Sequence, residues 1–263
     1  MVLVHGLSVT AALWRGHVPL LARQGLRVVR YDQRGHGHST RGTAPLNLNR
    51  LADDLAQLIN ATAPSGPLVL VGHSMGAMTL MRLTARHPHL APRITRLVLI
   101  SPPHAGVSTR TGTGPAQAVL TAGRNLLAHA CTHVPRLLDA IRRHAPATSR
   151  WALRPLSPVA LPLKPPSCRQ GLHALRTADI AALWHDLTAQ RHNLAPLKAL
   201  GGRVRILAGE WDTHIPAHQT RYLAQGLPQA QFQVVPEATH ALPLRHPHLV
   251  AEHIAAAREG VGR

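Results

Sequence analysis

Short apolar runs alternate with amphipathic stretches along the first 102 residues, and the same pattern returns after residue 198. Runs rich in leucine and β-branched residues predict strands, and apolar residues that recur every three or four positions predict helices. Strands alternating with helices are typical of βαβ units around a parallel sheet. The predicted strands span residues 2–4, 27–31, 68–71, 96–100, 204–207 and 232–235. Helices are expected near residues 14–21 and 51–59, directly after Ser74, and from Pro247 onward.

The segment from residue 103 to 198 interrupts this rhythm. Its apolar groups predict two helical stretches, and a proline-rich connection near residues 155–167 separates them. We therefore expect an α/β core made of residues 1–102 and 199–263. Residues 103–198 would form a helical cap or lid inserted into that core.

The length and the cysteine content bound the class of protein. A chain of 263 residues can form one α/β domain with an insertion and bury its core without disulfides or metal. Its two cysteines form no C-x-x-C pair and no His/Cys group at zinc spacing, so no metal site is predicted. The sequence has no secretory leader pattern and no membrane-spanning apolar run. We expect a cytoplasmic protein without membrane insertion.

The formal net charge is +18, from 29 lysines and arginines against 11 acidic residues. A clustered basic surface of this size would attract nucleic acid or anionic membranes. The arginines are instead spread from Arg15 to Arg263, and no basic run is interleaved with aromatic residues. We expect a solvated, arginine-rich surface and no nucleic-acid partner.

The segment Gly72–Gly76 has the sequence Gly-His-Ser-Met-Gly and lies between a predicted strand and a predicted helix. A serine in such a turn is held in a strained backbone conformation with its hydroxyl exposed. Gly72 and Gly76 let strand and helix approach closely, and the Met75 N–H lies at the positive end of the helix dipole. The pattern predicts Ser74 as a nucleophile; the alternative is a tight turn that merely contains serine.

A serine nucleophile needs a histidine base and a carboxylate that orients this base. Acidic residues are scarce after Ser74, and most of them lie in the predicted lid or on the last helix. Asp212 follows the predicted strand 204–207, at the edge where the carboxyl ends of parallel strands meet, so we select it as the acid. Glu210 is the alternative within two residues, and an ordinary surface carboxylate is the other interpretation of either side chain.

The chain contains 20 histidines, so position has to select the base among them. His240 lies in the loop that leaves the last predicted strand, just before the final helix. It completes the chain order Ser, Asp, His that accompanies a G-x-S-x-G nucleophile. His246 is the alternative, but it adjoins Pro247 at the predicted helix start and is better explained as a boundary residue.

The first predicted strand ends in a His-Gly turn at residues 5–6. Such a turn would present the N–H of Leu7 to the same space as the N–H of Met75, and two such donors hold an oxyanion. His-Gly alone also fits an ordinary turn. The loop 31–39 has glycine spacing similar to that of a phosphate loop but lacks G-x-G-x-x-G, so we interpret it as a structural brace.

Five segments, taken together, resemble the α/β-hydrolase superfamily in its serine-dependent, esterase- or lipase-like branch: residues 2–7, 31–39, 71–76, 209–216 and 239–247. The resemblance covers the predicted core, leaves the lid unmatched and implies that no cofactor is needed. It implies that Ser74 is the nucleophile, His240 the base and Asp212 the acid that orients this base. It also implies that the backbone N–H groups of Leu7 and Met75 are the two oxyanion donors. A serine nucleophile argues against the related epoxide hydrolases and haloalkane dehalogenases, which use aspartate there.

The chain departs from the family pattern at three points. Ala77 stands where a further glycine is frequent, and Thr239 precedes the histidine where glycine is common. Family members also usually carry two strands before the His-Gly strand, whereas this sequence starts inside that strand. The strand at 27–31 would then be an uncovered edge. We expect an incomplete N-terminus; the alternatives are a destabilised protein or a homodimer formed through that edge.

The expected reaction is hydrolysis of a small-molecule ester, lactone or thioester through an acyl-enzyme on Ser74. The apolar lid favours a substrate with a hydrophobic portion. Two alternatives remain open. The same triad could transfer the acyl group to another acceptor, or act as a cofactor-free haloperoxidase or perhydrolase. The fold could also be retained as a catalytically silent binding protein.

Overall fold

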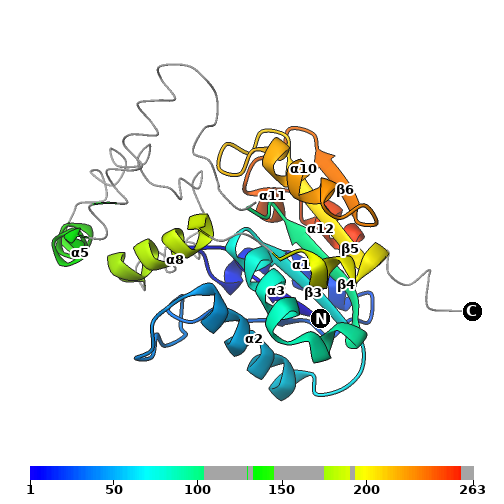
Figure 1. Ribbon diagram of the computed structural model, residues 1–263, viewed down its shortest axis with the longest axis horizontal. Helices are drawn as coiled ribbons and strands as arrows, with labels where there is room; N and C mark the ends of the chain where they lie inside the picture. Colours follow the sequence, from blue (N-terminus) through cyan, green and yellow to red (C-terminus); the bar gives the residue numbers. More distant parts are fainter. Residues whose placement is uncertain (104–128, 130–132, 145–174, 190–192, 256–263) are drawn as a thin grey trace, which may run out of the picture.

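The computed structural model describes residues 1–103, 129, 133–144, 175–189 and 193–255. They form a six-stranded parallel sheet with the strand order β2-β1-β3-β4-β5-β6 (Figure 1). All six predicted strands are present. β3 to β6 extend one or two residues beyond the prediction, whereas β2 is shorter. The strands are β1 Val2–Val4, β2 Val29–Arg30, β3 Leu68–His73, β4 Ile94–Ile100, β5 Val204–Gly209 and β6 Gln231–Val235.

Helices cover both faces of this sheet. The helix predicted near residues 14–21 is divided into two pieces, because the chain turns at Arg15 and Gly16. The core helices are η1 Ala11–Trp14, α1 His17–Ala22, α2 Leu48–Thr62, α3 Met75–Arg86, η2 Pro88–Arg93, η4 Gly201–Arg203, α10 Ala217–Gln225, α11 Leu242–Arg245 and α12 Pro247–Ala255. The described part of the predicted lid contains α5 Pro135–His144, α8 Thr177–Ala189 and α9 Ala195–Lys198.

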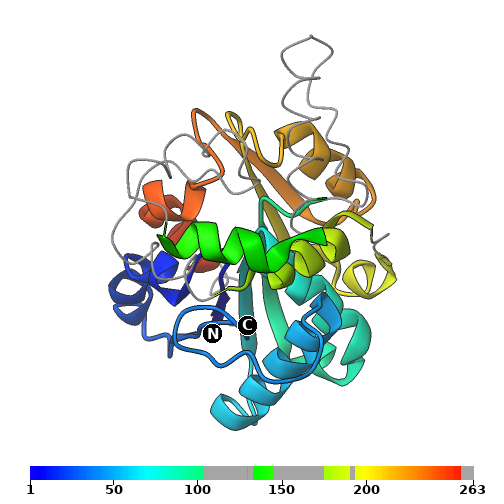
Figure 2. The same ribbon diagram turned by 90° about the vertical axis from the view of Figure 1, so that its left-hand side faces the viewer.

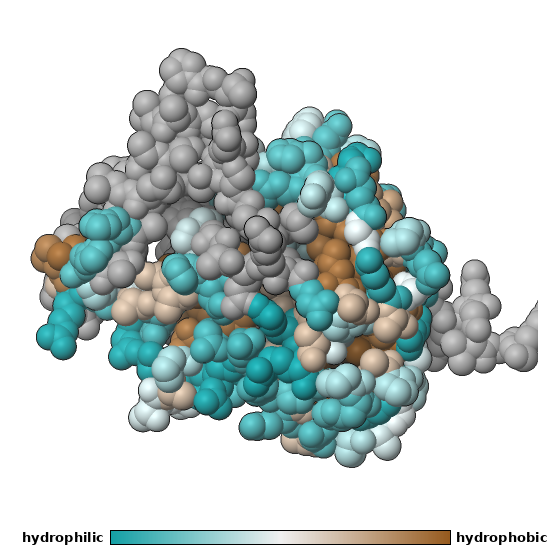
Figure 3. Space-filling view, in the orientation of Figure 1, coloured by the Kyte–Doolittle hydropathy of each residue, from teal (hydrophilic) through white to brown (hydrophobic). Residues whose placement is uncertain are grey.

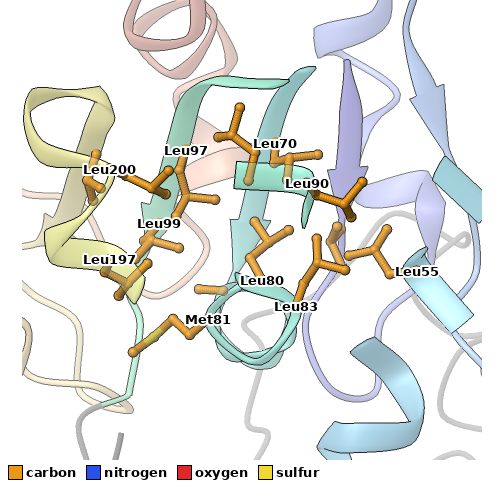
Figure 4. Packing of buried hydrophobic residues seen from close by; sticks show 14 of the residues in the cluster. Leu55, Leu70, Leu80, Met81, Leu83, Leu90, Leu97, Leu99, Leu197 and Leu200 are labelled. Atoms are coloured by element: carbon orange, nitrogen blue, oxygen red, sulfur yellow. The ribbon is translucent and has the colours of Figure 1, made fainter. Parts of the chain in front are cut away.

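The alternation of side chains along each strand builds two apolar layers. Leu70 and Leu99 point to one face, where they pack against α2, α3 and α9 (Figure 4). Val71 follows Leu70 and Val98 precedes Leu99 in the sequence, so both valines point to the other face of the sheet. There they pack against α1, α11 and α12. All four side chains are fully buried. Truncation of such a leucine to alanine typically costs about 2–5 kcal/mol, so this double-sided burial stabilises the whole sheet.

Helix α8 contacts α2 near the N-terminus of α2 (Figure 1). In the turned view of Figure 2, α5 lies in front of this region. The Leu48 N–H lies in the first turn of α2, where backbone N–H groups have no partner within the helix. It donates to Asp186 Oδ2 at 2.6 Å. Asn47 caps the same turn by accepting from the Arg50 N–H. The carboxylate also favours the positive end of the helix dipole, so one side chain of α8 stabilises α2 in two ways.

A second anchor joins α8 to the loop that follows β2. Asp179 is buried between two arginines, with Arg41 Nε at 2.8 Å and Arg176 Nε at 3.0 Å from its carboxylate oxygens. Burial by itself would raise the pKa of Asp179, but these arginines outweigh it and lower the pKa. The carboxylate therefore stays charged. The predicted proline-rich connection at 155–167 lies outside the described residues.

Strand β2 forms one edge of the sheet. Its two residues pair with Val2 and Leu3 of β1, and the Met1 ammonium group donates to Arg27 O at 2.9 Å. Within the described part of the chain, no strand pairs with the other side of β2. The expectations of further strands before Val2 and of a homodimer through this edge stay predictions.

The described surface in Figure 3 is mostly hydrophilic and is broken by smaller apolar areas. The expectations of an arginine-rich exterior and of no nucleic-acid partner stay predictions. None of the helices in the described ranges is both long and apolar enough to cross a lipid bilayer. The large apolar side chains exposed among these residues are Val134, Leu137, Trp211 and Tyr222.

His17 is a buried histidine at the start of α1. Its ring meets Trp14 edge-on at 5.0 Å, and neither ring nitrogen has a hydrogen-bond partner among the described residues. Burial lowers the pKa of His17 to about 4. Because this value lies below the ordinary 6.5, protonation of His17 favours the unfolded chain. The protein therefore loses stability as the pH falls from 6.5 toward 4.

Replacing His17 with leucine should raise the melting temperature at pH 7, because an unpaired buried polar group costs about 1–3 kcal/mol. Between pH 7 and pH 5, the free energy of unfolding of the variant should fall by about 2 kcal/mol less than that of the wild type. Urea unfolding at both pH values measures the two effects. The exposed His218 on α10 provides the control, since His218→Leu removes no burial penalty. A destabilised H17L protein with an unchanged pH slope would contradict this account.

Candidate active site

The strand order places a crevice between β1 and β3. The chain leaves β1 toward β2 on one side and returns to form β3 on the other side, so the loops after β1 and β3 diverge. In open α/β sheets, ligands bind at such switch points, outside the carboxyl ends of the strands. Residues His5 to Leu7 follow β1 and Ser74 follows β3, so both segments lie at this crevice.

Ser74 occupies a strained turn between β3 and α3. Its backbone angles are φ 53° and ψ −118°, in a region that residues other than glycine rarely adopt. The Ser74 N–H donates to Ile100 O at 2.8 Å, and its carbonyl accepts from the Ala77 and Met78 N–H groups. Strain of this kind costs about 1–3 kcal/mol and persists only where the surroundings impose it. The predicted elbow geometry around the serine is thus present.

Gly72 and Gly76 are required by close backbone contacts. A Cβ on Gly72 would lie 2.5 Å from Gly76 O, so strand and helix approach too closely for any side chain. A Cβ on Gly76 would collide with the carbonyl oxygens of Val4 and His5 at the end of β1. The first turn of α3 therefore rests directly on the backbone that leads to the His-Gly turn.

The buried Asp212 pairs with the partly exposed His240, whose Nδ1 lies 2.8 Å from Asp212 Oδ2. The other carboxylate oxygen accepts from the His214 and Ile215 N–H groups, both at 2.9 Å. Burial by itself would raise the pKa of Asp212, but the facing His240 and these hydrogen bonds lower it below its ordinary value. The carboxylate is therefore ionised and holds the histidine with Nδ1 as donor.

The two alternatives to this pair serve other purposes. Glu210 is exposed, and its carboxylate accepts from the Glu237 N–H at 3.0 Å, across the neighbouring loop. His246 is the C-terminal cap of α11 and directly precedes α12. The structure thus brings Asp212, rather than Glu210, to His240.

Two further histidines contact His240, and no sequence motif predicted a role for either of them. His73 Nε2–H donates to His240 O at 2.9 Å, and the two ring centroids lie 4.8 Å apart. Burial lowers the pKa of His73 to about 3, so this ring is neutral. The ring of His214 stacks on His240 at 5.1 Å. The sequence signals that could have pointed to them are that His73 directly precedes Ser74 and that His214 lies two residues after Asp212.

Ser74 Oγ and His240 Nε2 form no hydrogen bond with each other in the described part of the chain. Hydrogen bonds between nucleophile and base are often long without substrate and shorten when substrate binds. The contact of His240 with His73, the residue before Ser74, nevertheless places the base beside the nucleophile turn.

The two predicted oxyanion donors belong to segments that pack together. The side chains of Leu7 and Met75 lie in one buried apolar cluster, which α8 completes with Leu183 and Leu187. Among the described residues, the Leu7 N–H donates no hydrogen bond. Met75 is the first residue of α3, where backbone N–H groups have no partner within the helix.

No metal site was found among the described residues, in which no three His, Cys, Asp or Glu side chains are grouped closely enough to hold an ion. The groups that the described residues bring together at this crevice are a serine hydroxyl, an imidazole oriented by Asp212 and backbone N–H groups. These groups are the ones that acyl transfer requires.

A comparison with protein families agrees with this geometry. The family model of the alpha/beta hydrolase fold matches residues 1–247. The chain belongs to the α/β-hydrolase family. This confirms the resemblance drawn from the five sequence segments, and the parallel sheet with helices on both faces confirms the predicted fold class.

Two relatives of this α/β hydrolase are named for their activities. The non-heme chloroperoxidase CPO-A1 of Kitasatospora aureofaciens is 32% identical over 127 residues, which are 48% of this chain and 45% of the relative. The bifunctional esterase/perhydrolase DCH of Acinetobacter calcoaceticus is 34% identical over 97 residues, which are 37% of this chain and 34% of the relative. The match thus spans less than half of either relative.

Among solved structures, a thermophilic esterase from Thermogutta terrifontis is similar over 97% of this chain and 87% of its own. The TM-score is 0.66 and the sequence identity is 24%. At this identity the likeness shows the shared fold and does not extend to the substrate.

Gly76→Ala should destabilise the hydrolase by several kcal/mol, because the added methyl group would meet two backbone oxygens that cannot move aside. Circular dichroism melting of the purified protein measures the loss. Gly202→Ala is the matched control, since a Cβ there would have its nearest neighbour, Gln229 O, at 3.8 Å. Equal melting temperatures for G76A and wild type would show that the contact between α3 and β1 is not as close as described.

Proposed function

We propose that this protein is a serine hydrolase that cleaves an ester-like bond of a small molecule through an acyl-enzyme on Ser74. The observation that carries this proposal is the pair of His240 with the buried Asp212, at 2.8 Å, beside a serine in a strained turn. A buried carboxylate that holds an imidazole by Nδ1 leaves Nε2 free to accept a proton. Residues held in such strained backbone conformations cluster at active sites.

In the proposed reaction, Ser74 Oγ attacks the carbonyl carbon of the substrate while His240 Nε2 takes the hydroxyl proton. The negative oxygen of the tetrahedral intermediate accepts hydrogen bonds from the Leu7 and Met75 N–H groups. The intermediate collapses, and His240 gives its proton to the leaving alcohol. Water then attacks the acyl-enzyme with His240 as base, and the acid is released as Ser74 regains its proton.

Residues 103–198 are proposed to act as a lid over this crevice. Leu183 and Leu187 of α8 pack in the same apolar cluster as Leu7 and Met75, and α8 is held to the core by Asp186. An apolar cover next to the oxyanion donors favours a substrate with a hydrophobic acyl or alcohol portion. Rates on p-nitrophenyl esters of increasing chain length would define that portion.

A second candidate activity is perhydrolysis or halide oxidation with the same triad. It is favoured by the two relatives, one a chloroperoxidase and the other an esterase/perhydrolase. In this case hydrogen peroxide would replace water in the second step and release a peracid. Oxidation of a halide indicator that requires peroxide, a carboxylate and Ser74 would distinguish this activity from simple ester hydrolysis.

The protein should react with a fluorophosphonate probe, and Ser74→Ala should abolish the labelling, because only an activated serine attacks the phosphorus centre. Ester hydrolysis should fall by about 10⁴-fold or more in Ser74→Ala and His240→Ala. Asp212→Asn should lower kcat by about 10³- to 10⁴-fold, since the base would lose its orienting charge.

Ser65→Ala is the control for these variants, because Ser65 is an exposed serine in the loop between α2 and β3, at the opposite end of β3 from Ser74. It should keep both labelling and hydrolysis. Well-folded wild-type protein that neither labels nor hydrolyses any ester would overturn the enzyme proposal in favour of a binding protein.

A further inference from the structure

The peptide group between Gly6 and Leu7 lies directly beside the nucleophile. A Cβ on Gly6 would be 3.3 Å from Ser74 Cβ and 3.1 Å from His73 Nδ1. The N–H of this peptide group is the Leu7 donor, and its C=O is the carbonyl of Gly6. Any group that holds the carbonyl therefore also orients the donor.

The imidazole of His5 holds this carbonyl. His5 is fully buried, and its Nδ1 lies 2.8 Å from Gly6 O. Its Nε2 lies 2.9 Å from the backbone N of Gln33, which must be the donor. A ring that accepts at Nε2 and faces a carbonyl at Nδ1 carries its single proton on Nδ1. Burial lowers the pKa of His5 to about 3, so this neutral form persists across the physiological range.

The geometry of the peptide bond converts this contact into an orientation of the donor. No cis peptide bond is present among the described residues, and in a planar trans peptide the C=O and N–H point in opposite directions. We propose that His5 is the positioning residue of the oxyanion hole, because its Nδ1–H binds Gly6 O and thereby aims the Leu7 N–H toward the carbonyl oxygen of the substrate. This inference rests on the proposed function.

The next peptide group is held in the same way by a second buried histidine. The Ser8 N–H donates to His36 Nε2 at 3.3 Å, and His36 Nδ1 lies 3.1 Å from Arg34 O. Ser8 has a φ of 59°, so the chain turns sharply after Leu7. Two neutral imidazoles thus hold the peptide groups on both sides of Leu7, and its own N–H has no partner among the described residues.

Gln33 connects this turn to the helix that carries the other donor. Gln33 Nε2 donates to His5 O at 2.6 Å, and its Oε1 lies 3.1 Å from Thr79 Oγ1 on α3. Thr79 Oγ1 also lies 3.1 Å from Met75 O, one turn earlier in the same helix. One buried amide therefore fixes the Leu7 turn relative to Met75, so the distance between the two donors is set by side chains that touch no substrate.

The role of His5 predicts an asymmetry between two amide substitutions. In His5→Asn the amide nitrogen can take the place of Nδ1 and still donate to Gly6 O. In His5→Gln the amide reaches the place of Nε2, so the bond to Gly6 O is lost. Each variant keeps one of the two hydrogen bonds, so their melting temperatures should be similar.

H5Q should lower kcat on a p-nitrophenyl ester by about 30- to 100-fold with KM changed by less than about threefold, because the donor acts on the transition state. H5N should stay within about fivefold of the wild-type kcat. A role of His5 in stability alone would reduce both variants equally, in step with their melting temperatures. That result, or a rise in KM at constant kcat, would overturn the positioning role and leave the proposed function intact.

A second pair of variants keeps the test valid if neither substitution at His5 folds. Thr79→Val should lower kcat by about three- to tenfold at constant KM, since it frees the amide of Gln33. Thr84→Val is the matched control, because Thr84 is also buried on α3 and its hydroxyl donates only to Met81 O. Equal kcat values for T79V and T84V would refute the positioning role. A wild type that neither hydrolyses esters nor labels with fluorophosphonate would refute the proposed function, and the positioning role with it.

Discussion

The contact on which the rest of the site depends is between the first turn of α3 and the last carbonyl groups of β1. Gly76 lies against the oxygens of Val4 and His5 at a distance that no side chain permits. This contact brings the turn after β1 to the helix that follows Ser74. The strained serine, the two N–H groups and the switch point of the sheet then share one crevice. A looser contact would separate donors that belong to different βα units.

Neutral histidines satisfy several backbone groups around this contact. His5, His36 and His73 are each buried, and each meets a carbonyl through one ring nitrogen. A neutral imidazole offers one donor and one acceptor on a rigid ring, which suits irregular turns that have no regular backbone partners. The consequence is acid sensitivity, because burial lowers the pKa of all three and protonation would favour the unfolded chain.

Several of the few acidic residues of this basic chain form hydrogen bonds or ion pairs with other parts of the protein. Asp212 orients His240, Asp179 and Asp186 anchor α8 to the core, and Asp32 accepts from the N–H groups of Ala11 and His38 in the loop after β2. The net charge of +18 therefore reflects arginines in excess of these structural carboxylates. An acid that stays ionised while buried needs such partners. The scarcity of acidic residues also allowed Asp212 to be selected by its position after a predicted strand.

Local pattern determined the strands, the elbow at Ser74 and the choice of Asp212 and His240, because side-chain period, turn chemistry and chain order are encoded in neighbouring residues. The sequence pattern predicted a β2 that is too long, at residues 27–31, whereas the strand spans Val29–Arg30. Its length is limited because its partner β1 has only three residues. Only the tertiary structure decided which groups hold His240 and Leu7. Their partners, such as His73 for His240 and Gln33 for the His-Gly turn, are 167 and 28 residues away in sequence. Hydrogen bonds over such separations exist only after the sheet has assembled, so no local pattern records them.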